Sequence, residues 1–175
     1  MSRVPARDFG SVDELRAAVG THLGYSEWVA VDQERIDTFA AATGDRQWIH
    51  VDPRRAAAGP FGSTIGHGYL TLSLLPALVG SFVEYSGWPV KVNYGSNRVR
   101  FLTPVRVDSR VRAGVTVTSV TETPAGTQLV TQVQVDIEDA AGEPGPRPAL
   151  VAEVITLLTA PHAQTPPAPT SNPGW

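Results

Sequence analysis

The chain has 175 residues, 42% of them hydrophobic, and this length and composition indicate one globular domain with a substantial core. Its 14 Lys and Arg residues against 17 Asp and Glu residues give a net charge of −3, and no basic stretch alternates with aromatic residues, so we expect no nucleic-acid partner. Cysteine is absent, which excludes disulfides and thiolate metal sites, and the first residues lack the apolar stretch of a secretory signal, so we expect a cytoplasmic protein.

The first predicted element is a short helix near the start of the chain. Ser11-Val12-Asp13-Glu14 matches a capping box, and Gly20 fits the left-handed stop that ends such a helix. We interpret residues 1–24 as an N-terminal helical extension of a domain that covers residues 25–160.

A strand and an amphipathic helix follow. Residues 28–31 have the pattern of a strand, Asp32 is placed to cap a helix, and Gly44 is placed to end it. Further on, Asp52-Pro53 combines an N-cap with the residue best suited to a first helical position, which predicts one or two helical turns over residues 54–58.

A longer helix is predicted from Gly68 to about residue 85. It is apolar around nearly its whole circumference, which is typical of a buried helix, and Pro76 should bend it. A membrane span is the alternative, but about sixteen residues at about 1.5 Å each reach only about 24 Å, short of a hydrocarbon core of roughly 30 Å. We therefore expect no membrane association.

The rest of the chain up to residue 160 has the pattern of strands. Apolar and polar residues alternate with the period of two of a half-buried strand, most clearly over residues 111–118 and 129–137. Helices followed by four strands of antiparallel appearance predict an α+β fold, with the helices on one face of a sheet. Residues 161–175 are rich in proline and poor in apolar side chains, so we expect a disordered tail.

Two segments carry residues suited to chemistry. Asp45 and His50 lie five residues apart on a turn, where two titratable groups can hold one water molecule. The segment of residues 61–69 leads from a glycine-rich loop into the long helix, whose first amides can stabilise a developing oxyanion. Taken singly, an acid after a helix is usually a solvated turn residue, and a lone histidine usually has a structural role.

Together these segments resemble the MaoC-type (R)-specific enoyl-CoA hydratases. The family motif is Ser/Thr-Gly-Asp, a short spacer and an apolar residue before His, then His-Gly ahead of the central helix; here the matching elements are Thr43-Gly44-Asp45, Ile49-His50 and His67-Gly68. The resemblance spans residues 28–160 and implies a hot-dog fold, in which a curved antiparallel sheet wraps around a long helix. Where family members commonly carry Asn-Pro, this chain has Gln47-Trp48, which resembles the NodN-like branch.

The resemblance also implies a role for each residue of the motif. Asp45, ionised, would deprotonate the water, and His50 would hold that water and relay a proton to the α-carbon on the same face, which means syn addition. The backbone N–H of Gly68 would bind the thioester oxygen. No separate cofactor is implied, because coenzyme A is part of the substrate.

Several other residues are weaker candidates for substrate contact. Trp48, Phe61 and Tyr69 fit the walls of an acyl pocket, although core packing explains them equally well. Arg98 and Arg100 alternate on a strand and suit the phosphates of coenzyme A, but solvated arginines on a strand face are common.

The histidines are not expected to bind a metal. His67 is a further weak candidate for substrate contact, and it is more typical of a residue that orders the loop or caps the helix than of one that transfers protons. Four scattered histidines without cysteine lack the spacing of a metal site, so we expect none.

Three functions are compatible with these residues. The main hypothesis is an enoyl-CoA hydratase, working in reverse as a 3-hydroxyacyl-thioester dehydratase on coenzyme A or acyl-carrier-protein thioesters. The alternatives are a hot-dog thioesterase and a non-catalytic acyl-thioester binding subunit. Thioesterases of this shape generally use an acid on or near the long helix, and residues 69–83 contain none. A homodimer is expected, because an isolated hot-dog sheet leaves an exposed edge that pairing would cover.

Overall fold

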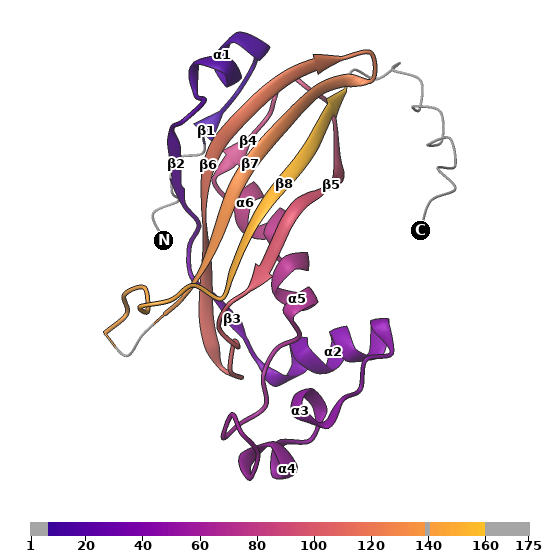
Figure 1. Ribbon diagram of the computed structural model, residues 1–175, viewed down its shortest axis with the longest axis vertical. Coiled ribbons are helices and arrows are strands. Elements are labelled where there is room, and N and C mark those ends of the chain that lie inside the picture. The colour runs from indigo at the N-terminus through magenta and orange to yellow at the C-terminus, as the bar shows by residue number, and fades with distance from the viewer. Residues whose placement is uncertain (1–6, 139–140, 160–175) are drawn as a thin grey trace.

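A curved antiparallel sheet of six strands encloses two short helices placed end to end in the computed structural model (Figure 1). The structure describes residues 7–138 and 141–159, so the predicted tail of residues 161–175 lies outside it. The sheet order is β2-β6-β7-β8-β5, and β3 also pairs with β6. The strands are β1 (Arg7–Asp8), β2 (His22–Tyr25), β3 (Val29–Val31), β4 (Val83–Glu84), β5 (Val90–Phe101), β6 (Ser109–Thr123), β7 (Gly126–Ile137) and β8 (Leu150–Thr159), and the helices are α1 (Val12–Ala17), α2 (Gln33–Thr43), α3 (Trp48–Val51), α4 (Pro53–Ala57), α5 (Gly68–Ser73) and α6 (Leu75–Gly80).

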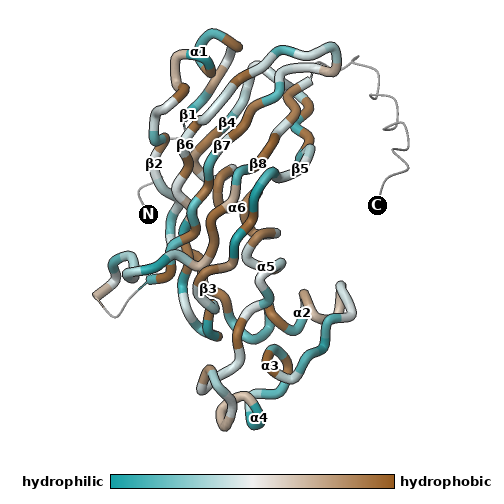
Figure 2. The backbone as a smooth tube through the Cα atoms, in the orientation of Figure 1, coloured by the Kyte–Doolittle hydropathy of each residue, from teal (hydrophilic) through white to brown (hydrophobic). Residues whose placement is uncertain are grey.

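The core lies between the concave face of the sheet and the helices α5 and α6. The predicted alternation is confirmed, because the apolar residues of β6 and β7 point inward and are almost completely buried: Val111, Ala113, Val115, Val117, Leu129, Val133 and Val135. Complete burial of one such side chain stabilises the fold by about 1.5–3 kcal/mol. Figure 2 shows hydrophobic and hydrophilic residues succeeding one another along these strands and the helices beside them.

The central helix is shorter than predicted and is interrupted. Pro76 has no N–H to donate, and the regular helix is broken at Leu74 between α5 and α6. The chain leaves the helix after Gly80 instead of near residue 85, because Val83–Glu84 forms β4 and pairs with β1. No helix among the described residues is long and apolar enough to span a membrane.

The central helix is also less buried than predicted. Its inner side is in the core, but a stripe on the other side is exposed: Tyr69, Ser73, Pro76, Ala77 and Gly80. These residues recur at helical spacing, so the apolar composition does not mean burial on all sides.

The N-terminal segment belongs to the same core as the rest of the domain. Ser11 caps α1 as predicted, accepting a hydrogen bond from the N–H of Glu14 at 3.3 Å. Phe9, Leu15 and Leu23 are buried in the main cluster, and β2 pairs with β6. The predicted N-terminal extension therefore contributes both core residues and a strand to the sheet.

Candidate active site

Local helix signals position Asp45. Asp32 caps α2 by accepting a hydrogen bond from the N–H of Arg35 at 2.9 Å, and Gly44 ends the helix in the left-handed region at φ 80°. The chain turns sharply there, so Asp45 begins a loop. Its side chain is 57% exposed, and its Oδ1 lies 3.4 Å from the N–H of Gln47. The carboxylate is therefore accessible to solvent and to a substrate.

His50 is buried on α3 with one ring nitrogen committed. Its Nδ1 lies 2.7 Å from the backbone oxygen of Ile65. A carbonyl oxygen only accepts, so we assign the proton of the neutral ring to Nδ1, and Nε2 keeps a lone pair. Burial lowers the pKa of His50 below its ordinary value of 6.5, and the neighbouring His67 lowers it further. His50 is thus suited to receive a proton at neutral pH.

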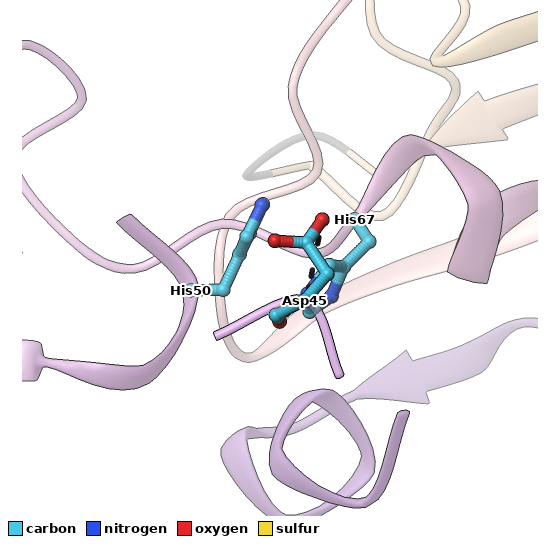
Figure 3. A group of neighbouring side chains, drawn as sticks. All are labelled: Asp45, His50 and His67. Carbon is cyan, nitrogen blue, oxygen red and sulfur yellow. Dashed lines mark hydrogen bonds and ion pairs between the residues drawn. The ribbon is translucent and has the colours of Figure 1, made fainter. Parts of the chain in front are cut away.

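His67 connects Asp45 and His50. It is only 3% exposed, and its Nε2 lies 2.9 Å from the backbone oxygen of Asp45 and 4.0 Å from the carboxylate oxygen Oδ2. Its ring stacks on His50 with centroids 3.7 Å apart and also contacts Phe39. Figure 3 shows the three side chains converging from the loop, α3 and the start of α5. The structure therefore brings together residues that are 22 positions apart in the sequence.

These three residues have the ligand types of a metal centre, but their geometry does not fit one. One potential ligand atom from each residue lies within 4.8 Å of the others. A metal ion must lie in the plane of each imidazole that binds it, however, and the two rings are stacked at an angle of only 23°. An ion in the plane of one ring would lie outside the plane of the other, so this arrangement does not fit a shared metal ion.

Gly68 is the first residue of α5, and its N–H has no acceptor within that helix. A side chain is excluded at this position, because a Cβ would lie 2.9 Å from the ring of Phe101 on β5. Phe101 also packs against Tyr69, with ring centroids 5.8 Å apart. Sequence analysis missed Phe101, because this contact joins a helix to a strand 33 residues later and no spacing indicates it.

A second group that sequence analysis missed holds His50 in place. The side chain of Gln33 donates from Nε2 to the backbone oxygen of His50 at 2.8 Å. Its Oε1 accepts a hydrogen bond of 2.6 Å from the hydroxyl of Thr64, which is 1% exposed. Thr64 precedes Ile65, the acceptor for the His50 ring. Gln33 therefore joins α2 to both segments that fix the imidazole.

The other predicted contact residues lie in different places. Trp48 is half-buried against Arg55 and Gly59, on the α4 side of α3, and Phe61 is half-buried in the turn after α4. Arg98 and Arg100 alternate on β5 with Val99 and Phe101, which pack against the core and Gly68. The two arginines line a groove with Gln132 and Glu153 on the opposite face of the sheet. The expected contact of these arginines with carrier phosphates stays a prediction.

A cavity of about 350 Å³ lies between the helices and the concave face of the sheet. Its helical wall begins at Leu72, one turn after Gly68, and continues through Leu75, Pro76 and Val79. The sheet contributes residues such as Val133 and Val154. The cavity thus extends along the helices from one turn beyond Gly68, and its lining does not include Asp45, His50 or His67.

Comparison with known proteins identifies the family. Residues 14–139 match the family described as the MaoC like domain. The chain belongs to the MaoC-like family. A 3-hydroxyacyl-thioester dehydratase Z from Mycobacterium tuberculosis is 48% identical over 155 residues, which cover 88% of this chain and 99% of that protein. Nodulation protein N from Rhizobium leguminosarum is 46% identical, covering 85% and 91% of the two chains.

The MaoC-like fold is also found among solved structures. An (R)-hydratase from A. caviae involved in PHA biosynthesis superposes with a TM-score of 0.64 at 25% identity, covering 81% of this chain and 96% of that chain. This likeness, together with the curved sheet around α5 and α6, confirms the predicted hot-dog fold of the α+β class.

Proposed function

We propose that this protein is an (R)-specific enoyl-thioester hydratase, which works in reverse as a 3-hydroxyacyl-thioester dehydratase. The observation that carries the proposal is the convergence of the exposed Asp45 carboxylate and the buried His50, whose free nitrogen is Nε2. The names of the relatives from Mycobacterium tuberculosis and A. caviae support the same reaction.

The proposed chemistry adds water across the carbon–carbon double bond next to the thioester. Asp45 takes one proton from the water as its oxygen bonds to the β-carbon, and the electron pair of the double bond moves to the thioester oxygen as an enolate. The N–H of Gly68, beside the positive end of α5, stabilises that oxygen. His50 receives that proton from Asp45 at Nε2 and passes it to the α-carbon, which restores the thioester carbonyl and leaves Asp45 ionised again. Both groups lie on one side of the substrate, so the addition is syn.

Loss of the absorbance of the conjugated enone of crotonyl-CoA tests this function. We expect Asp45→Asn and His50→Gln to lower turnover by about a thousandfold or more while the variants remain folded by circular dichroism. His22→Gln on β2 is the matched control, because that histidine lies in the sheet and contacts Tyr25, whereas Asp45 and His50 lie in a loop and on α3. Full activity in both site variants would show that the residues are wrongly assigned.

The two alternative functions are separated by their products. A thioesterase would release a free thiol, which a chromogenic disulfide detects, and a binding subunit would retain the substrate unchanged. Within the described residues, the helix from Gly68 to Gly80 carries no acidic side chain, which disfavours the thioesterase.

We further propose that the cavity beside α5 and α6 holds the acyl chain. It is mainly apolar, and it begins one helical turn from the amide that would bind the thioester oxygen. The thiol carrier is coenzyme A or acyl-carrier protein, and no other cofactor takes part. We place the protein in the cytoplasm, since a chain without cysteine needs no oxidising compartment.

We also propose a homodimer that covers β5. This strand pairs with β8 on one side only, and all of its residues are exposed or half-buried. Val92 is 43% exposed and Tyr94 is 60% exposed, and Tyr69, which packs against Phe101 at the other end of β5, is 70% exposed. A long edge strand with apolar side chains favours pairing with a second copy.

A further inference from the structure

Trp48 is held in a fixed position on the surface of α3. A Cβ on Gly59 would lie 2.9 Å from two carbons of the indole ring, so the ring packs directly on the backbone of the turn after α4. Any residue with a side chain at position 59 would displace the indole. The tryptophan of the Gln47-Trp48 variant therefore forms part of a specific α3–α4 contact.

The indole supports the guanidinium of Arg55. The Cζ atom of Arg55 lies 4.5 Å from the centroid of the Trp48 ring, while the side chain remains exposed. Asp52 is the acid nearest to Arg55 in the sequence, and it accepts the backbone N–H of Arg55 as the cap of α4. In the described chain, the arginines with carboxylate partners are Arg16, Arg110 and Arg112.

Arg55 is therefore a positioned cation without an anionic partner among the described residues. The N–H groups of a guanidinium lie in its own plane. When the guanidinium stacks on an aromatic face, these groups stay free at its edge, where they can bind two oxygens of a phosphate. The exposed side chains of Arg46 and Arg54 are close in sequence and also lack a carboxylate partner in the described part of the chain. The segment that carries the reacting groups is thus locally basic in a protein with a net charge of −3.

The position of Arg55 suits a group that is remote from the reaction. Trp48 and His50 are two residues apart on α3, and such residues point to nearly opposite sides of a helix. His50 faces Ile65 and His67, whereas Trp48 and Arg55 lie on the side of α4, at the lower end of the molecule in Figure 1. The pantetheine arm of a thioester carrier likewise separates its phosphates from the sulfur.

We propose that Arg55, supported by Trp48, binds a phosphate group of the thioester carrier. This inference rests on the function proposed above. It identifies a phosphoryl subsite on α4 and replaces the expectation that Arg98 and Arg100 provide it. The phosphate belongs either to the nucleotide part of coenzyme A or to the 4′-phosphopantetheine shared by coenzyme A and acyl-carrier protein.

The test compares Arg55→Gln with the unaltered protein on three crotonyl thioesters, those of coenzyme A, pantetheine 4′-phosphate and pantetheine. We expect KM for crotonyl-CoA to rise about tenfold or more, because a charge-assisted contact is lost, with little change for the pantetheine thioester. A rise for the 4′-phosphate thioester as well would assign the contact to the phosphate that both carriers share. A rise for crotonyl-CoA alone would assign it to the nucleotide phosphates.

Two further variants test the role of the indole. Trp48→Phe keeps an aromatic face and should retain most of the affinity, whereas Trp48→Leu should approach Arg55→Gln. Arg16→Gln removes the same charge from α1, at the far end of the molecule, and serves as the matched control. The proposal is overturned if Arg55→Gln changes KM equally for all three thioesters, if it leaves all of them unchanged, or if only Arg98→Gln and Arg100→Gln weaken crotonyl-CoA.

A binding experiment separates this proposal from the proposed function. Calorimetric titration with coenzyme A and with pantetheine requires no turnover. If the unaltered protein hydrates none of the thioesters, the proposed function fails. The phosphoryl subsite still stands if coenzyme A binds and Arg55→Gln weakens that binding at least tenfold, and it fails if the variant binds coenzyme A equally well.

Discussion

His67 is the residue on which the arrangement of the site depends, although the reaction needs no proton from it. Its ring supports His50, and its Nε2 holds the backbone of Asp45. Two substitutions separate these contacts. His67→Gln keeps a donor but loses the ring, whereas His67→Phe keeps a ring but loses the donor.

We expect His67→Phe to lower kcat by about tenfold to a hundredfold, because the loss of a buried hydrogen bond costs roughly 1–3 kcal/mol. His67→Gln should retain more activity if the position of Asp45 matters most. Removal of His67 also removes one cause of the lowered pKa of His50, so the acid limb of the rate profile should move to higher pH in both variants. Unchanged kcat and an unchanged profile in both variants would rule out this positioning role.

The pKa of His50 also predicts how the unaltered protein responds to pH. Burial, and to a lesser extent His67, lowers this pKa below 6.5 in the folded state, so the neutral ring persists at neutral pH. In a profile from about pH 5 to pH 8, kcat/KM for hydration should be limited by His50 only below 6.5. An acid limb with its midpoint above 6.5 would contradict this prediction.

Folding stability should show the same dependence. The unfolded chain binds a proton at His50 more readily than the folded chain does. The contribution of His50 to the free energy of unfolding is therefore present above pH 6.5 and is lost as the pH falls through the lowered pKa of the folded state. Urea midpoints at about pH 5.5 and about pH 7.5 measure the effect. His50→Gln should show a smaller difference between the two pH values, and an equal difference would assign the effect to other groups.

Gly68 at the start of α5 lies directly against the ring of Phe101 on β5. A methyl group at position 68 would lie 2.9 Å from that ring, so Gly68→Ala should displace the start of α5 and lower kcat/KM by about a hundredfold. Adding Phe101→Ala should recover part of the loss, because it removes the Cγ and Cδ atoms that the new methyl group would meet. Gly10→Ala is the control, since a Cβ there has an ordinary contact of 3.7 Å. Without any recovery in the double variant, the contact with Phe101 would not be the cause.

Elements governed by local chemistry could be predicted, and those governed by packing could not. Ser11, Asp32 and Asp52 each cap a helix as predicted, because a capping side chain bonds to an amide only two or three residues away. The motif also indicated Asp45 and His50. The direction of Trp48 depends on the orientation of a four-residue helix, and the bond from Gln33 to the backbone of His50 spans 17 residues. Neither the direction of Trp48 nor this hydrogen bond can be predicted from a local sequence pattern.

The packing of the N-terminal segment also depends on residues far away in the sequence. Its helix was predicted from Ser11, but its place in the core depends on contacts of Leu15 and Leu23 with strands beyond residue 100. The predicted N-terminal extension therefore contributes residues to the core that the later strands also build.

The exposed edge strand β5 predicts that the whole molecule is a dimer. We expect a dimer by light scattering, and we expect Val92→Lys combined with Tyr94→Lys to give a monomer, because two charges would enter an apolar contact. Val19→Lys is the matched control, since Val19 is 45% exposed but lies beyond the end of α1. A clean monomer in the unaltered protein, or a dimer that survives both lysines, would show that β5 is not the interface.

The order of the sheet has a consequence for how the protein is made. β8 comes after the other strands in the chain, yet it lies between β7 and β5 and supplies the pairing partner of β5 along its whole length. A nascent chain must therefore keep β5 unpaired until residues 150–159 have left the ribosome, and the sheet closes only after most of the polypeptide has been synthesised. Such non-local pairing slows folding and leaves β5 open to wrong partners during synthesis.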